Sequence, residues 1–270
     1  MGITPFQRAI CRLIAANRAQ TDQAYVAGGV ALNLLLDAPR ISLDIDLFHD
    51  TAESLAKTWD EDRRLLTERG YAVEIVRERP SFVEALVRKG GESVLMQWTQ
   101  DSAYRFFPLL THDDLGLTLH PFDLATNKVL ALAGRLEPRD WIDLMGCHHG
   151  VQRLGYLAWA ACGKDPGFSP EGILNEAKRS SRYTAVEIAE LSFDGPPPDV
   201  AALSEEWKSM LSEAEEIIGL LPVDTVGTCV LAADGQLFRG GADEAARALA
   251  RGTLHFHPGS IRGAFPRIAA

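Results

Sequence analysis

Residues 25–50 read YVAGGVALNLLLDAPRISLDIDLFHD, and this stretch decides how the chain is interpreted. The Asp-Ile-Asp near its end is predicted to lie on a strand, where alternate side chains share a face, so Asp44 and Asp46 project together. Two like charges held side by side repel each other, and a divalent cation between them removes that cost. Gly28 and Gly29 open a short apolar helix, whose N-terminal amides can hold a phosphate. The stretch therefore predicts a site for a metal ion and a nucleotide.

Each half of this pattern has an ordinary structural explanation when it is taken alone. A Gly-Gly pair commonly marks a tight turn, and an Asp-x-Asp is more often a solvated strand face or a turn than a metal site. The order of the parts argues for a site, because the apolar helix is followed by Arg40-x-Ser42-x-Asp44-x-Asp46. This order resembles the first motif of the DNA polymerase β-like nucleotidyltransferases. The arginine and serine resemble specifically the AbiEii/AbiGii toxin branch of that superfamily.

A second block, residues 122–145, reads FDLATNKVLALAGRLEPRDWIDLM. Taken alone it predicts an amphipathic helix with a solvated lysine, then a helix that starts at Pro138 with acidic residues near its N-terminus. Placed after the first motif, it resembles the second conserved half of the AbiEii pattern, Lys-x-x-Ala-Leu followed by Arg-Asp-x-x-Asp-Leu. The matching positions are Lys128, Ala131, Leu132, Arg139, Asp140, Asp143 and Leu144.

The resemblance implies a metal-dependent nucleotidyltransferase that moves an NMP from an NTP to an acceptor hydroxyl. The implied metal ligands are Asp44 and Asp46, with Mg²⁺ as the ion and Mn²⁺ as its alternative. The implied nucleotide-binding residues are Gly28, Gly29, Arg40, Ser42 and Lys128, and the implied catalytic set is Asp44, Asp46, Lys128 and Asp143. Whether Asp140 or Asp143 has the direct role stays open. The implied acceptor is RNA, with a tRNA end as the candidate, and the implied partner is a cognate antitoxin protein.

One departure from the pattern concerns a third carboxylate, which relatives commonly place on a later strand beside the metal aspartates. The equivalent strand is predicted at residues 93–98, SVLMQW, and contains no acid. Glu92 and Asp101 flank it and are candidate substitutes, while Gln97 is a candidate for the slot itself. The missing acid favours one alternative, a nucleotide-binding module with weak or no turnover. A nucleotidyltransferase that acts on a small molecule is a further alternative, because housekeeping and antibiotic-modifying relatives share the first motif.

Composition limits the remaining choices. The net charge of −10 argues against a broad nucleic-acid surface held by counterion release alone, although a local basic groove is compatible with it. No apolar run is long enough for a transmembrane helix, and the first 20 residues lack the features of a signal peptide. The 4 cysteines are scattered without a CxxC pair, which predicts reduced, buried thiols in a cytoplasmic protein.

The predicted organisation is α+β, with a nucleotidyltransferase-type mixed sheet and flanking helices followed by a mainly helical region. We expect a core domain at 1–120 and a C-terminal domain at 121–270 that ends in a β-hairpin around Asp234-Gly235. The predicted helices span residues 5–19, 29–36, 51–69, 121–134, 138–149, 151–162, 170–180, 183–191, 200–220 and 242–250. The predicted strands span residues 43–48, 71–77, 82–88, 93–99, 115–119, 226–232 and 236–239, with an extended piece at 253–257.

Overall fold

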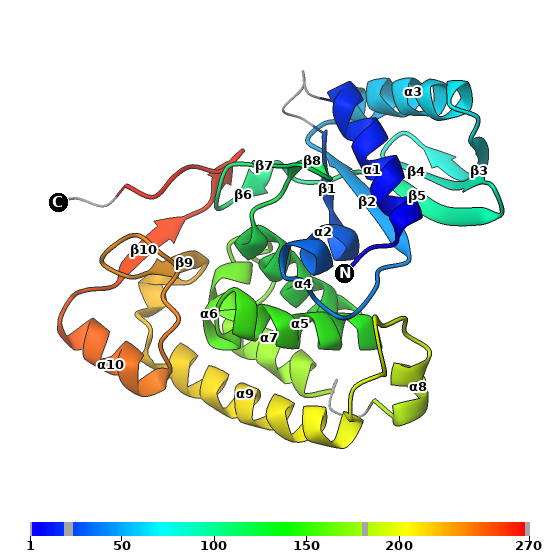
Figure 1. Cartoon of the computed structure of the whole chain (residues 1–270). Helices are drawn as coiled ribbons and strands as arrows, with labels where there is room; N and C mark the ends of the chain where they lie inside the picture. The colour runs from blue at the N-terminus through cyan, green and yellow to red at the C-terminus, as the bar shows by residue number, and fades with distance from the viewer. Residues whose placement is uncertain (1, 19–23, 180–182, 268–270) are drawn as a thin grey trace. The chain divides into compact units, whose positions relative to one another are not determined.

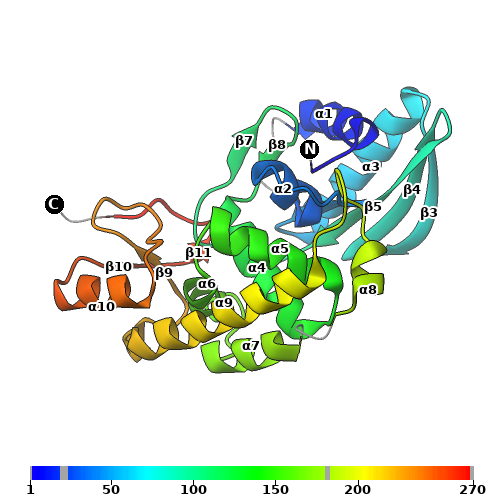
Figure 2. The same ribbon diagram turned by 60° about the horizontal axis from the view of Figure 1, so that its bottom comes forward.

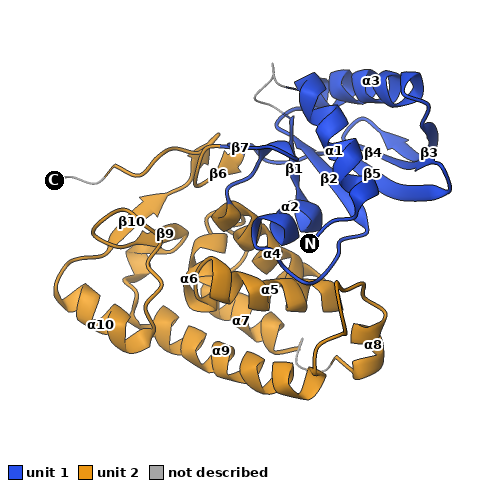
Figure 3. Cartoon of the chain, in the orientation of Figure 1, with its two compact units in different colours: residues 1–103, 109–120 blue, residues 104–108, 121–270 orange. Residues whose placement is uncertain are grey.

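The computed structural model describes residues 2–18, 24–179 and 183–267 (Figure 1). Residues 19 and 180, the predicted ends of two helices, lie outside this part of the chain. Chain contacts define two compact units: unit 1 spans 1–103 and 109–120, and unit 2 spans 104–108 and 121–270 (Figure 3). The division into two domains after residue 120 stays a prediction.

Unit 1 is built on a mixed sheet. Its helices are α1 (Pro5–Arg18), α2 (Gly28–Leu35) and α3 (Ala52–Glu68). Its strands are β1 (Ala24–Ala27), β2 (Asp44–His49), β3 (Ala72–Arg79), β4 (Phe82–Lys89), β5 (Glu92–Gln100), β7 (Leu110–His112) and β8 (Gly116–Thr118). Within the described residues these strands form one seven-stranded sheet in the order β3-β4-β5-β2-β1-β8-β7. Strand β2 runs parallel to β5 and antiparallel to β1, which confirms the predicted mixed α+β architecture.

Side chains along β2, β4 and β5 alternate between a buried and a half-exposed face. Helix α3 covers the buried face, where Trp59 packs edge-on against Trp98 with ring centroids 4.7 Å apart. Asp44 and Asp46 lie on the half-exposed face, which we call the aspartate face, as the predicted strand alternation requires. The helix is fixed at its start by Thr51, whose side chain accepts a hydrogen bond from the amide of Ser54.

Unit 2 is mainly helical, with α9 lying along α6 and α7 (Figure 2). Its helices are α4 (Pro121–Gly134), α5 (Pro138–Gly150), α6 (Leu154–Ala161), α7 (Pro170–Ala177), α8 (Ala185–Ala189), α9 (Val200–Leu220), α10 (Ala242–Ala250) and the 3₁₀ turn η2 (Val223–Thr225). Its strands are β6 (Tyr104–Arg105), β9 (Thr228–Leu231), β10 (His255–Pro258) and β11 (Ser260–Ile261).

The predicted terminal hairpin forms only over a short length. The turn at Asp234-Gly235 forms, and an antiparallel bridge joins Leu231 to Leu237. The Ala232 amide donates to the Gln236 carbonyl at 2.8 Å and the Phe238 amide to the Val230 carbonyl at 3.1 Å, but residues 236–239 do not extend this pairing into a ladder. The antiparallel ladder of β9 is instead made with β10, over 20 residues further along the chain. A turn signal specifies a local reversal, whereas the choice of strand partner depends on which segment returns to the same edge.

All 4 cysteines are buried free thiols, as predicted. No helix in the described residues is long and apolar enough to cross a membrane.

The buried carboxylate of Asp123 explains why residues 104–108 belong to unit 2. It accepts hydrogen bonds from the amides of Phe106 at 2.9 Å and Phe107 at 3.1 Å. It also lies 2.9 Å from the ammonium nitrogen of Lys164, which is itself buried. The Asp123 side chain at the start of α4 therefore holds residues 104–108 and the turn after α6 at the same point.

We expect Asp123→Ala to lower the free energy of unfolding by about 3–5 kcal/mol, because it leaves a buried lysine without its charged partner. Urea unfolding followed by tryptophan fluorescence measures this. Asp123→Asn keeps an acceptor for one amide and should cost less. A loss below about 1 kcal/mol for the alanine variant, as for an exposed ion pair, would contradict this role.

Candidate active site

The closest packing at the site is between the backbone of Gly28 and the side chain of Asp46. Strand β1 pairs antiparallel with β2 so that Ala27 lies opposite Asp46, which places the first residue of α2 directly beside that carboxylate. Gly28 has a φ of +64°, and a Cβ there would overlap the Asp46 carboxylate. Both observations require glycine. A residue with a side chain rarely adopts a positive φ, and its Cβ would have no room beside Asp46.

The second glycine faces the other two residues of the motif. A Cβ at Gly29 would lie 2.6 Å from Ser42 Oγ and 2.9 Å from Arg40 Nη2. Arg40 and Ser42 are both buried. The structure thus brings Gly28, Gly29, Arg40, Ser42 and Asp46 together around the N-terminus of α2.

Two buried side chains hold the loop that carries Arg40 and Ser42. The amide of Asn33 donates to the carbonyl of Arg40 at 2.8 Å, and the amide of Gln7 donates to the carbonyl of Ser42 at 2.6 Å. Neither residue is among the motif positions described above. Their role depends on a loop returning to α1 and α2, a nonlocal contact that a local motif does not reveal.

This arrangement suits an anionic ligand and a hard cation. The N-cap residue of α2, Ala27, makes no side-chain capping hydrogen bond, so the amides of the first turn receive none from it. Such amides, together with a guanidinium and a hydroxyl, are groups that bind phosphate. The paired carboxylates of Asp44 and Asp46 are the oxygen donors that Mg²⁺ and Mn²⁺ prefer, and the space at Gly28 is kept free of a side chain. The donor set therefore fits the implied metal ion.

Neither flanking acid of β5 lies beside the aspartate pair. Glu92 shares its face of β5 with buried Val94, opposite to the aspartate face. Asp101 follows the end of the strand, where its amide donates to the carbonyl of His49 rather than lying level with Asp46. Gln97 occupies the slot, because it is the parallel register partner of Asp46.

An acid that the sequence analysis missed lies one strand further on. Glu84 of β4 is the register partner of Gln97, and its carboxylate accepts a hydrogen bond from the Gln97 amide at 3.0 Å. Among the described side chains, no group of three or more His, Cys, Asp or Glu is arranged to hold a metal ion. At this level of the sheet, the aspartate face presents the carboxylates of Asp46 and Glu84 with the Gln97 amide between them.

The second predicted motif forms a compact ionic cluster in unit 2. The Lys128 ammonium lies 2.9 Å from Asp140 Oδ1 and 3.0 Å from Asp143 Oδ2, and all three side chains are buried. Arg135, which the sequence analysis did not name, donates to Asp140 Oδ2 at 2.8 Å. Burial opposes the ionisation of Asp140, but the charges of Lys128 and Arg135 outweigh it and lower the pKa of that carboxyl.

The two motifs belong to different units, so a common site containing Asp44, Asp46 and Lys128 stays a prediction. Within unit 2, Lys128 and Asp143 lie together. Within unit 1, the predicted residues that lie together at the start of α2 are Gly28, Gly29, Arg40, Ser42 and Asp46.

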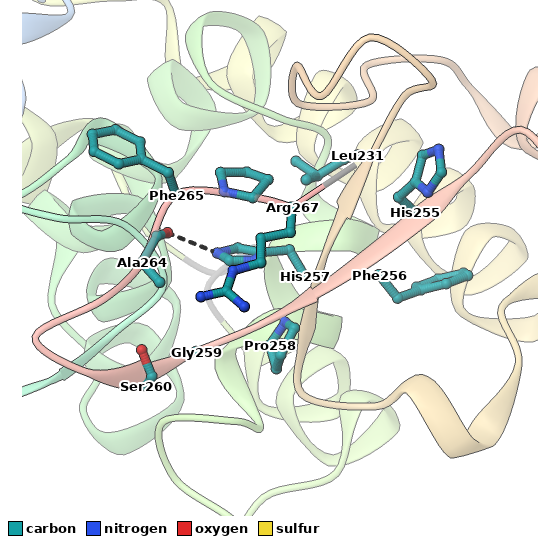
Figure 4. A pocket seen from close by; sticks show the side chains of 11 residues that line it. Leu231, His255, Phe256, His257, Pro258, Gly259, Ser260, Ala264, Phe265 and Arg267 are labelled. Carbon is teal, nitrogen blue, oxygen red and sulfur yellow. Dashed lines mark hydrogen bonds between the residues drawn. The ribbon is translucent and has the colours of Figure 1, made fainter. Parts of the chain in front are cut away.

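Neither of two cavities formed by described residues of unit 2 contains a predicted site residue. One, of about 280 Å³, is lined mainly by the C-terminal residues 255–260 and 264–267 (Figure 4). In it, His257 Nε2 lies 3.1 Å from the carbonyl oxygen of Ala264 and 2.9 Å from that of Phe106 (Figure 4 marks the first of these contacts). The other, of about 490 Å³, lies between α9 and α10 and is lined by both acidic and basic side chains.

Comparisons with known proteins agree with this fold and motif. Residues 12–111 match the family described as nucleotidyl transferase AbiEii toxin of type IV toxin–antitoxin systems. A nucleotidyltransferase described as putative, from Helicobacter pylori, superposes with a TM-score of 0.53 at 16% identity, covering 79% of this chain and 95% of that one. MenT4, a nucleotidyltransferase toxin from Mycobacterium tuberculosis H37Rv, superposes with a TM-score of 0.51 at 13% identity, covering 81% and 85%. No curated protein sequence matches the chain.

The mixed sheet with a Gly-Gly helix start packed on Asp-x-Asp is that of a nucleotidyltransferase. Over residues 12–111 the chain is similar to the AbiEii toxin family. The match ends before Lys128, so the roles of Lys128 and Asp143 rest on the resemblance of their own motif.

We expect Gly28→Ala to lower nucleotidyl transfer roughly 100-fold, because it displaces Asp46 by the width of a methyl group. Gly91→Ala is the matched control: its φ of +86° carries the same backbone strain, but nothing lies within 4 Å of the added Cβ. Transfer rates of the two variants, each checked for folding by circular dichroism, measure the difference. Equal losses in both would show that backbone strain, not the contact with Asp46, matters.

Proposed function

We propose that the protein transfers an NMP from an NTP to a hydroxyl of RNA, with tRNA ends as the leading acceptor, in a reaction that requires Mg²⁺ or Mn²⁺. The observation that carries the proposal is the convergence of Gly28, Gly29, Arg40, Ser42 and Asp46 at the start of α2. A toxin acting in the cytoplasm and held in check by a cognate antitoxin protein is the biological setting that the family description suggests.

Each group has a proposed task. Asp44 and Asp46 hold the divalent cation, while the first-turn amides of α2, Arg40 and Ser42 bind phosphate oxygens. When bound, the cation offsets the charge of the triphosphate and of the pyrophosphate as it leaves.

The proposed task of Lys128 is to balance charge that develops on the phosphates during displacement. Asp140 and Asp143 hold its ammonium in place at 2.9 and 3.0 Å. Asp143 is the acid we assign to the catalytic set, because Asp140 is already paired with Arg135.

One observation favours the second candidate, a nucleotide-binding module with weak or no turnover. Gln97 stands opposite Asp46 where relatives commonly have an acid that orients the attacking hydroxyl. An amide can accept a hydrogen bond from a hydroxyl but is too weak a base to take its proton. A small-molecule acceptor is the third candidate.

The test is to incubate the purified protein with each labelled NTP, Mg²⁺ and total RNA, and to follow label that ribonuclease releases. We expect Asp46→Asn to lower transfer on the order of 100-fold or more, because it removes a charged cation ligand. Asp60→Asn, at an exposed position of α3, removes the same charge away from the site and should leave transfer unchanged. Chelation with EDTA should stop the reaction, and added Mg²⁺ or Mn²⁺ should restore it.

Transfer that survives Asp46→Asn or EDTA would overturn the proposal. Cation-dependent NTP binding without transfer to RNA or to small molecules would establish the binding module instead.

A further inference from the structure

A row of polar side chains crosses three neighbouring strands on the aspartate face. Gln97 of β5 stands in the middle, with Asp46 of β2 as its parallel partner and Glu84 of β4 as its antiparallel partner. Adjacent strands are roughly 5 Å apart, so Gln97 lies within side-chain reach of both acids. All three residues are half-exposed, in contrast to their buried neighbours on the same strands.

The hydrogen bond to Glu84 determines which way the Gln97 amide points. Gln97 Nε2 lies 3.0 Å from Glu84 Oε1. An ionised carboxylate can only accept hydrogen bonds, so the amide must turn its NH₂ group toward it. The carbonyl oxygen of Gln97 is then on the side of the amide away from Glu84, and Asp46 is the neighbour on the strand beyond.

We propose that the Gln97 carbonyl oxygen is a neutral third ligand of the cation held by Asp44 and Asp46, and that Glu84 is the positioning residue that fixes its orientation. This inference rests on the proposed function. Amide oxygens are ordinary ligands of hard divalent cations, alongside carboxylates. A ligand that could rotate freely would offer its NH₂ group to the cation half the time, and the bond to Glu84 prevents this.

The arrangement has an electrostatic consequence for the site. Two carboxylates and an amide carry one negative charge fewer than three carboxylates would, so the site binds a free cation more weakly than a triacidic site. Glu84 restores a negative charge near the cation from one strand further away. A third carboxylate directly beside Asp46 would instead add to the repulsion between Asp44 and Asp46.

Binding of Mn²⁺ to the full-length protein tests the inference without relying on activity, because the EPR signal of free Mn²⁺ falls as the ion binds. We expect Gln97→Ala, which removes the ligand, and Glu84→Gln, which weakens the bond that orients it, each to lower Mn²⁺ affinity about tenfold. Glu78→Gln is the matched control: it removes the same charge from an exposed position of β3 and should leave binding unchanged.

The double variant Gln97→Ala/Glu84→Gln separates orientation from simple charge. If Glu84 acts mainly through Gln97, the double variant loses clearly less Mn²⁺ affinity than the two single losses added together. If Glu84 attracts the cation only by its charge, the two losses add, and the positioning role is overturned.

The exchange Glu84→Gln/Gln97→Glu keeps the net charge and lets the hydrogen bond re-form with its direction reversed. It places a carboxylate at position 97, so we expect Mn²⁺ to bind several-fold more tightly than to the unaltered protein. Weaker or unchanged binding would overturn the position of Gln97 beside the cation.

Asp46→Ala distinguishes failure of this inference from failure of the proposed function. Loss of Mn²⁺ binding in Asp46→Ala but not in Gln97→Ala overturns the third ligand and leaves the proposed function standing. Mn²⁺ binding that survives Asp46→Ala overturns the proposed metal site and the third ligand with it. Thermal unfolding of each variant shows whether it is folded.

Discussion

The arrangement of the candidate site depends on the contact between the Gly28 backbone and the Asp46 carboxylate. The antiparallel register of β1 and β2 sets this contact, since it places Ala27 opposite Asp46. A slip of one residue would bring Ile45 to that position and turn both aspartates toward the buried face. The same register therefore decides that the acids are accessible and that the N-terminus of α2 lies beside them.

The buried face of the sheet keeps this register in place. Ile45, Met96 and Trp98 are fully buried there, and a slip would exchange them for polar residues. The indole N–H of Trp98 donates a hydrogen bond to the carboxylate of Asp62 at 2.8 Å. Asp62 also forms an ion pair with Arg18 of α1. Burial, with help from the Arg18 charge, lowers the pKa of His49 on β2 to about 3, so its imidazole is neutral at neutral pH.

Local signals predicted most of the elements but not the way they pair. The cap at Thr51, the glycine turn at 90–91 and the alternation around Asp44 were readable because each depends on neighbouring residues. Strand β1 was missed, because its four buried residues are too few to show a period. Glu84 was missed for a different reason: it looks like any polar position of an alternating strand until the order β4-β5-β2 places it beside Gln97.

The cluster around Lys128 shows what the second motif achieves physically. A buried ammonium is costly unless it is paired, and two carboxylates at 2.9 and 3.0 Å provide that pairing. Arg135 shares Asp140, so the four groups carry two positive and two negative charges and balance without a ligand. Under the proposed function, a phosphate must compete with these carboxylates for Lys128. A triphosphate carries more negative charge than a monophosphate, so under the proposed function it competes better for Lys128.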